Sequence, residues 1–246
     1  LGPAATATLV RALEDADPRV RTSAAMSLGR RPLTVPQRRA LVGRINKERW
    51  GMVAGQLAEA LGAHCDGDGV AALRETTRHG SRGYAVDRRA LESMARCKPR
   101  GMGKFLLATA SDRRWRTGMR TRALSLISPT LGRAMTSELV ALFEKLRRGA
   151  MRSEADEQVA VAAAGTLGSV GGAAAADALA GALALEPLPT VRLAAALALG
   201  RACHESTRAT LVQASRDAPS RLMQAAKNSL ARCGWSTDKT KKPPTP

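Results

Sequence analysis

One short pattern returns seven times along the chain. An apolar residue is followed four positions later by a small or apolar residue, and eight positions later by another apolar residue. The apolar anchors are Val20, Val53, Val86, Met119, Val159, Val191 and Leu222, separated by 33, 33, 33, 40, 32 and 31 residues. Positions four and eight apart share one face of a helix, so the pattern describes one apolar stripe repeated seven times. Such a period is typical of stacked two-helix units, each of which buries its apolar face against its neighbours.

A second helical segment precedes each stripe. Asp17 is suited to an N-cap and Pro18 to the first turn of a helix, and a glycine that closes the stripe suits its C-terminal end. Four of the stripes close in this way, at Gly29, Gly62, Gly168 and Gly200. The preceding helices are expected at residues 5–14, 37–47, 70–78, 102–110, 131–148, 174–185 and 207–215. The sequence therefore predicts an all-α fold, an α-solenoid of about seven two-helix repeats over residues 1–235. Residues 236–246 are expected to form a disordered, basic, proline-rich tail.

The amino-acid sequence of the repeat resembles that of a known family. The stretches Asp17-Pro18-Arg19-Val20-Arg21 and Leu188-Pro189-Thr190-Val191-Arg192, each followed by an alanine-rich run that ends on glycine, are similar to HEAT-like repeats of the phycobilisome lyase type. The resemblance covers about residues 5–234. It implies that the second helix of each pair lines a concave face, and that the protein is a scaffold or adaptor, since only a few members of the family are enzymes. It also implies that the arginine after an anchor, as at Arg21, Arg120 and Arg192, pairs with an acidic residue of a neighbouring unit.

Positive charge is concentrated in the first part of the chain. The formal net charge is +18, and residues 1–153 hold 29 Lys or Arg against 13 Asp or Glu. Residues 154–246 hold 10 against 8, so the solenoid is predicted to have a basic half, 1–153, and a near-neutral half, 154–235. This imbalance favours an acidic partner, which is an acidic protein face, an anionic polymer or membrane, or nucleic acid.

Seven residues are the candidates for binding that partner. Arg88, Arg89 and Arg122 follow their anchors by two or three positions and are expected on the concave side. Arg113, Arg114, Trp115 and Arg116 begin the fourth unit, where guanidinium groups and an indole can grip phosphates or an acidic helix. Alternatively, Trp115 fills a gap between repeats beneath solvated arginines.

The four cysteines have the spacing of the repeat. Cys65 and Cys97 lie 32 residues apart, and Cys203 and Cys233 lie 30 apart, each just after the second helix of successive units. Two disulfides, Cys65 to Cys97 and Cys203 to Cys233, would join neighbouring units if the loops bring the Cα atoms within roughly 7 Å. They would indicate a periplasmic or extracellular protein. The alternative is four buried thiols duplicated with the repeat, in a cytoplasmic protein.

Motifs for catalysis or metal binding are weak. His64 and His204 adjoin cysteines, but no spacing of a zinc site is present. The stretch Asp66-Gly67-Asp68-Gly69 has only part of a calcium loop and is interpreted as a turn. No catalytic residue, metal ligand or cofactor is therefore predicted.

Three functions remain open at the level of the sequence. The preferred hypothesis is a non-enzymatic scaffold that binds an acidic protein or an anionic envelope polymer. The second is a nucleic-acid binder similar to the HEAT-like DNA glycosylases. An enzyme of that kind needs a carboxylate and aromatic residues in its groove, and the only candidates in this sequence are Asp112 and Trp115. The third is a chromophore lyase subunit, for which free reactive thiols are the minimum requirement.

Overall fold

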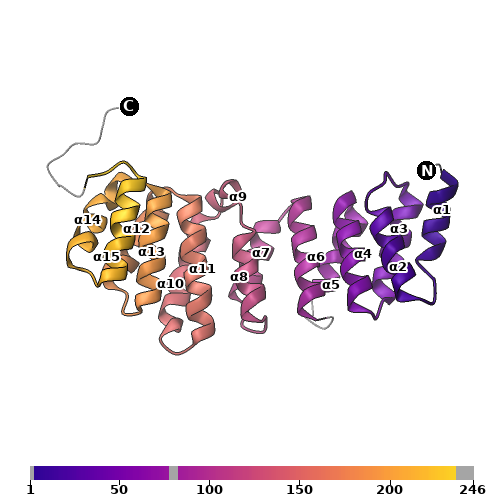
Figure 1. Cartoon of the computed structure of the whole chain (residues 1–246), viewed down its shortest axis with the longest axis horizontal. Helices are drawn as coiled ribbons and strands as arrows, with labels where there is room; N and C mark the ends of the chain where they lie inside the picture. Colours follow the sequence, from indigo (N-terminus) through magenta and orange to yellow (C-terminus); the bar gives the residue numbers. More distant parts are fainter. Residues whose placement is uncertain (1–2, 78–82, 237–246) are drawn as a thin grey trace. The chain divides into compact units, whose positions relative to one another are not determined.

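A computed structural model describes residues 3–77 and 83–236 of the chain (Figure 1). Over these residues it contains α-helices, one short 3-10 helix and no strand, so the prediction of an all-α solenoid is confirmed. The first six helices are α1 (Pro3–Ala12), α2 (Pro18–Leu28), α3 (Val35–Lys47), α4 (Gly51–His64), α5 (Gly67–Thr77) and α6 (Tyr84–Cys97). The next are α7 (Met102–Ser111), α8 (Thr117–Ser125), α9 (Pro129–Arg133), α10 (Thr136–Ala150) and α11 (Glu154–Val170). The chain continues with α12 (Ala173–Leu185), α13 (Pro189–Ala202), η1 (Glu205–Thr207), α14 (Arg208–Asp217) and α15 (Ser220–Arg232).

The helices divide into two compact units, unit 1 (Leu1–Met102) and unit 2 (Gly103–Pro246). Unit 1 contains the helix pairs α1–α2, α3–α4 and α5–α6. Unit 2 contains α7–α8, α10–α11, α12–α13 and α14–α15, with α9 inserted between the first two pairs. The single solenoid over residues 1–235 stays a prediction, and residues 237–246 of the expected tail lie outside the described part of the chain.

The apolar stripe is buried and lies in the second helix of every pair, except that Ile127 follows the end of α8. All seven residues four positions after an anchor and all seven residues eight positions after it have exposed fractions of 6% or less. Six of the anchors are buried as well. The exception is Val20 of the first pair, which is 39% exposed. The repeat pattern thus identified the core correctly, apart from the first anchor.

The glycines that close four stripes lie at the C-terminal ends of their helices, as expected, and have a second role as well. Gly29 caps α2 with an ordinary helical φ of −61°, and the other three lie inside their helices. Each lies against a small residue of the next second helix. A Cβ at Gly29, Gly62, Gly168 or Gly200 would come within 3.0, 2.9, 2.7 or 2.8 Å of the Cα atom of Ala60, Ser93, Ala198 or Ser229. These glycines therefore allow neighbouring second helices to approach closely.

One predicted helix is wrong. The segment 131–148 was expected to be continuous, but the structure contains α9 and α10 with a break at Ala134 and Met135. Gly132 packs against Val170, and Gly103 at the start of α7 packs against Met135, with no room for a Cβ at either glycine. The 40-residue step between Met119 and Val159 is explained by this insertion, since α9 and its turns occupy the additional length.

None of the helices in the described residues combines the length and apolar character needed to cross a membrane. The alanine-rich run from Val159 to Leu185 is divided between α11 and α12 by a turn at Gly171 and Gly172. Both glycines have positive φ, 70° and 85°, which a residue with a Cβ rarely adopts.

Candidate partner-binding surface

The structure brings the four cysteines together in the predicted pairs. The Cα atoms of Cys65 and Cys97 are 5.1 Å apart and those of Cys203 and Cys233 are 5.3 Å apart, both within the range of a disulfide. One pair lies in unit 1 and the other in unit 2, and each joins the ends of two consecutive second helices. No cysteine of the chain is left free.

Two local features reduce the separation that helix packing alone would leave, which is roughly 8 to 10 Å between axes. Gly62 and Gly200 set the closest approach of the two helices, against Ser93 and Ser229. Cys65 and Cys203 each follow this glycine by three residues and adopt left-handed backbone angles, with φ of 53° and 45°, which turn the chain toward the neighbouring helix. The spacing G-x-x-C in one repeat and S-x-x-x-C in the next was a signal for this geometry that the sequence analysis missed.

The arginine after an anchor behaves as the family resemblance implies in two of three cases. Arg21 is buried and donates to both carboxylate oxygens of Glu48 in the next pair, at 2.9 and 3.1 Å. Burial raises the pKa of Glu48, but hydrogen bonds from Arg21, from the backbone amide of Trp50 and from Arg44 outweigh it and bring the pKa to about 2. Arg192 instead donates to the backbone carbonyl of Leu183.

Arg120 provides the second case and explains one predicted binding residue. Its guanidinium lies 2.9 Å from the buried carboxylate of Asp156 on α11. Arg113, predicted to bind a partner, also donates to Asp156, although its side chain is 71% exposed. Burial raises the pKa of Asp156, but Arg113 and Arg120 together lower it below its usual value. Arg113 therefore forms an ion pair between two repeats through Asp156, and any role in binding a partner would be additional.

Arg88 and Arg89, the predicted binding residues of unit 1, have carboxylate partners inside the unit. Arg88 pairs with Glu92 at 2.9 Å along α6, and Arg89 reaches across Gly55 to Glu59 of α4 at 3.5 Å. Both side chains remain more than a third exposed. Their role in binding stays a prediction, and their contact with the partner would have to compete with these pairs.

The remaining predicted residues lie around α8. Arg114 is 91% exposed and forms a bidentate pair with Asp112, two residues away. Trp115 is half-buried, Arg116 is the exposed N-cap residue of α8, and Arg122 is half-buried with a hydrogen bond to the hydroxyl of Ser125. The intermediate exposure of Trp115 is compatible both with binding a partner and with filling a gap between repeats.

The turn before α8 belongs to a larger cationic surface in unit 2. The guanidinium of Arg113 lies beside Gly149 near the end of α10, and Arg148 and Arg152 are close to Gly149 in the sequence. Arg148 and Arg152 are exposed and were not identified from the sequence, because they are 30 or more residues away from the turn. We call the set Arg113, Arg114, Arg116, Arg148 and Arg152 the basic edge. Within the described residues, Arg116, Arg148 and Arg152 have no carboxylate partner.

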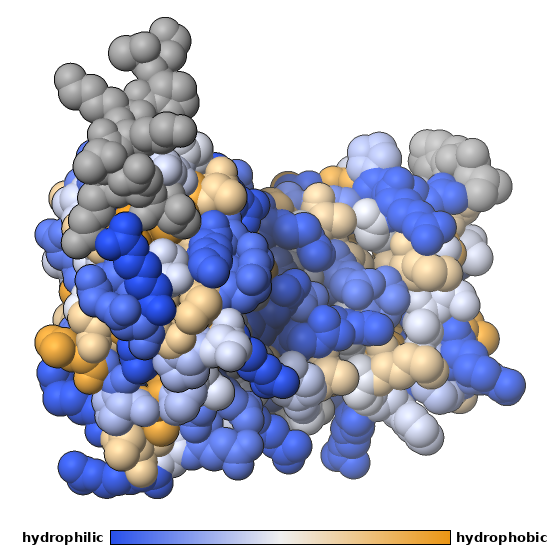
Figure 2. Space-filling model, turned by 60° about the vertical axis from the view of Figure 1, so that its left-hand side comes forward, coloured by the Kyte–Doolittle hydropathy of each residue, from blue (hydrophilic) through white to orange (hydrophobic). Residues whose placement is uncertain are grey.

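The histidines and the Asp66 turn have ordinary structural contacts. Hydrophilic residues cover most of the face seen in Figure 2, and hydrophobic residues form small separate patches on it. His64 contacts the carbonyl of Leu28, and His204 contacts the hydroxyl of Ser206. Asp66 accepts from the backbone amide of Gly69 at the start of α5, as expected of a turn. A group of three or more His, Cys, Asp or Glu residues able to hold a metal ion is not found among the residues that the structure covers.

Comparison with known proteins supports the repeat fold. Residues 141–232, from within α10 to the end of α15, match the family model of HEAT repeats. No curated protein matches the sequence. The phycobilisome lyase type is not supported by any comparison.

Three solved structures are among those that match this chain. A mutant of Kap121p has a TM-score of 0.59 and 14% identity, over 95% of this chain and 29% of that chain. Human deoxyhypusine hydroxylase in complex with glycerol has a TM-score of 0.44 and 21% identity, over 95% and 85% of the two chains. An engineered protein has a TM-score of 0.48 and 17% identity, over 93% and 68%. At these identities the first similarity shows the fold alone, and the TM-scores of the other two are too low to indicate a shared activity.

Proposed function

We propose that this chain is a non-enzymatic scaffold or adaptor that binds an acidic partner protein through the basic edge of unit 2. A solenoid of HEAT repeats fits a scaffold or adaptor, since such repeats present extended surfaces rather than enclosed sites. The observation that carries the proposal is the presence of Arg116, Arg148 and Arg152 on adjacent turns without carboxylate partners. An exposed arginine with no internal partner can pair with a carboxylate of another protein at little cost in lost contacts.

The cysteine pairs support a second part of the proposal, that the protein works in an oxidising compartment such as a periplasm or the cell exterior. Disulfides persist in such compartments and are rare in the cytoplasm. Both predicted pairs have disulfide geometry, and in both units it depends on a glycine between the helices and a cysteine with left-handed backbone angles. Peptide mass spectrometry of protein from its native source, alkylated before any reduction, is expected to find the two linked peptide pairs. Four alkylated thiols would contradict this part of the proposal.

The binding test uses a fluorescent glutamate-rich peptide as the acidic probe, with affinity measured by fluorescence anisotropy. The variant replaces Arg116, Arg148 and Arg152 by Glu. Arg113 is left intact, because Arg113→Glu would place a carboxylate against the buried Asp156 and disturb folding. Reversing three exposed charges is expected to weaken binding about tenfold or more, at a few tenths to 1 kcal/mol for each exposed pair.

A matched control changes the same number of charges in unit 1, by replacing the exposed residues Arg30, Arg49 and Arg100 with Glu. Its affinity for the probe should stay within about threefold of the wild type, since the basic edge is intact. Equal losses in the two variants would mean that the probe senses net charge alone, and the proposed site would be wrong. Tighter binding of duplex DNA than of the peptide, with a steep fall between low and physiological salt, would indicate a nucleic-acid binder instead.

A further inference from the structure

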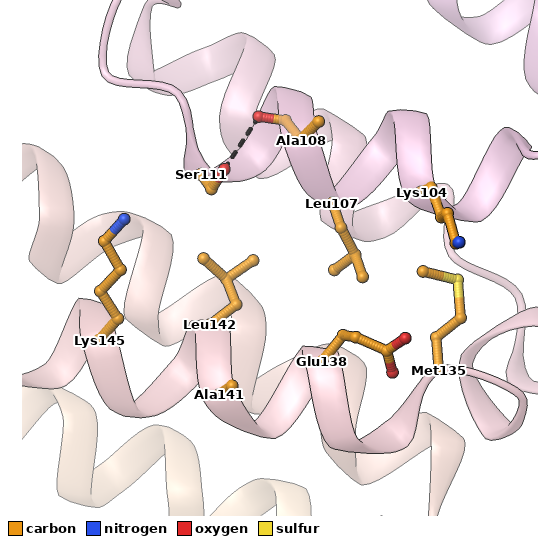
Figure 3. A pocket seen from close by; sticks show the side chains of 9 residues that line it. All are labelled: Lys104, Leu107, Ala108, Ser111, Met135, Glu138, Ala141, Leu142 and Lys145. Carbon is orange, nitrogen blue, oxygen red and sulfur yellow. Dashed lines mark hydrogen bonds between the residues drawn. The ribbon is translucent and has the colours of Figure 1, made fainter.

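Unit 2 contains an apolar groove between α7 and α10, with a volume of about 400 Å³ (Figure 3). Leu107 of α7 and Leu142 of α10 extend into it from opposite walls, and Met135 lies at one end. Ala108 and Ala141 are exposed on its two walls. Polar groups lie only around the rim, at Lys104, Ser111, Glu138 and Lys145. The groove is therefore a hydrophobic trough with a charged border.

The groove exists because α9 interrupts the regular stacking of first helices. Further along unit 2, α10 packs against α12 and α12 packs against α14. Between α7 and α10 the inserted segment fills only one end, where Met135 and Leu131 pack against Gly103. Leu107 and Leu142 are 9% and 7% exposed, and this remaining apolar surface faces an open volume that the rest of the repeat would normally fill.

The two ends of the groove differ in charge. Lys104 and Glu138 lie at the Met135 end, and their opposite charges offset each other. Lys145 and Ser111 lie at the other end, and the groove has no carboxylate there. This end continues into the basic edge, because Arg148 lies one turn beyond Lys145 on α10, and the turn that carries Arg113, Arg114 and Arg116 follows Ser111. A molecule bound in the groove would contact apolar side chains along its length and cations at the Lys145 end.

We propose that this groove binds an amphipathic helix of the acidic partner, with its apolar stripe over Leu107, Met135 and Leu142 and its acidic end at Lys145 and the basic edge. The inference rests on the function proposed above and specifies the partner. A trough between two helices accepts a third helix through residues at i, i+3 or i+4 and i+7, which form a straight apolar row. A volume of about 400 Å³ is within the range of pockets that bury a ligand well, and it admits several apolar side chains. Charge complementarity at the Lys145 end fixes the direction of the helix.

The test uses a labelled synthetic peptide of 16 residues with a leucine stripe at helical spacing and glutamates in its first turn, where they also favour the helix. Ala108→Trp with Ala141→Trp fills the groove from both walls. Both alanines are exposed, so neither indole has to enter the core. Ala174→Trp, at an exposed alanine of α12, is the matched control. We expect the groove variant to lose about tenfold or more in affinity and the control to bind like the wild type. Circular dichroism should show the same helix content in all three proteins.

The outcomes separate this inference from the proposed function. Loss of peptide binding in Arg116→Glu, Arg148→Glu, Arg152→Glu, with full binding in the groove variant, would leave the basic edge as the site and overturn the inference. Full binding in both variants would overturn both proposals. A peptide with lysines in place of the glutamates should bind at least tenfold more weakly, and equal binding would contradict the direction set by Lys145. Binding of oleate in the groove, without binding of the peptide, would show that the occupant is an acyl chain and would also overturn the inference.

Discussion

Unit 1 and unit 2 both place arginines at and near the turns between paired helices, but they use these arginines differently. In unit 1, Arg21 and Arg44 converge on the buried Glu48, and Arg44 also pairs with Glu14 at 3.0 Å. Carboxylates likewise engage Arg19, Arg38, Arg39, Arg88 and Arg89 of this unit. In unit 2, Arg116, Arg148 and Arg152 of the basic edge have no such partner in the residues described. The exposed Arg30, Arg49 and Arg100 of unit 1 have none either, but they lie in three separate loops. In unit 2 the contact of Arg113 with Gly149 brings the two turns of the basic edge together. The comparison teaches that an excess of positive charge in a sequence does not locate the charge that is available for binding.

The largest expected effect is on the buried cluster of unit 1. Glu48→Gln leaves the buried Arg21 without a counter-charge and leaves Arg44 with Glu14 alone, which should cost about 3–5 kcal/mol of unfolding free energy. The comparable change in unit 2 is Glu186→Gln, because Glu186 ends α12 as Glu48 ends the helix α3. Its partner Arg147 keeps Glu144 and is partly exposed, so a loss of about 1–2 kcal/mol is expected. Chemical denaturation of the two variants measures the difference, and equal losses would contradict the account of the cluster.

Removing either cysteine pair should have the next largest effect. The loops that the pairs close span 32 and 30 residues, for which a disulfide contributes about 3–4 kcal/mol in the chain-entropy model. Cys65→Ser with Cys97→Ser and Cys203→Ser with Cys233→Ser should therefore destabilise the oxidised protein to a similar extent. Denaturation with and without a reducing agent provides the check. A wild type whose stability does not respond to reduction would contradict the disulfides.

The pH dependence of stability follows from Glu48. The pKa of Glu48 is about 2 in the folded protein and about 4.5 when it is unperturbed. Its stabilising contribution is fully present above pH 4.5 and is lost as the pH falls toward 2, up to about 3 kcal/mol. Unfolding curves between pH 6 and 2 should show this fall in the wild type and a smaller one in Glu48→Gln. Parallel curves would mean that other carboxylates dominate acid unfolding.

The smallest of these effects comes from the glycines between second helices. Gly62→Ala and Gly200→Ala force a Cβ against the neighbouring helix and should cost about 1–3 kcal/mol. Gly43→Ala is the matched control, because its Cβ would meet nothing within 4 Å inside the helix α3. That variant should gain up to about 1 kcal/mol through helix propensity. A gain at Gly62 as well would show that the close approach does not require glycine.

Local periodicity was sufficient to predict the fold. The anchors and the stripe of Leu28, Leu61 and their equivalents recur at the positions that the fold buries, so their spacing predicted the helix pairs. The 32- and 30-residue spacing of the cysteines predicted which cysteines lie together. The break at Ala134 was missed because residues 131–148 keep a helical pattern across it. The contacts of Gly103 and Gly132 with distant residues lie at this break, and the sequence does not show them.

The candidate site was only partly predictable. Arg113, Arg114 and Arg116 are adjacent in the sequence and were found, whereas Arg148 and Arg152 join them only through the stacking of α8 on α11. The carboxylate partners of Arg88 and Arg89 were also missed. For Arg89 the reason is the same, because its partner Glu59 lies on another helix. The groove could not be anticipated at all, since it depends on space left open by the missed break.

Hydrogen–deuterium exchange of the protein with and without the acidic amphipathic peptide would locate the binding surface, because it reports both units in one measurement. The account predicts slower exchange in residues 104–117 and 138–153 of unit 2, with no change in the helices α4 and α6 that carry Glu59, Arg88 and Arg89. Protection centred on α4 and α6, or spread evenly over both units, would contradict the claim that the free cations of unit 2 form the binding surface.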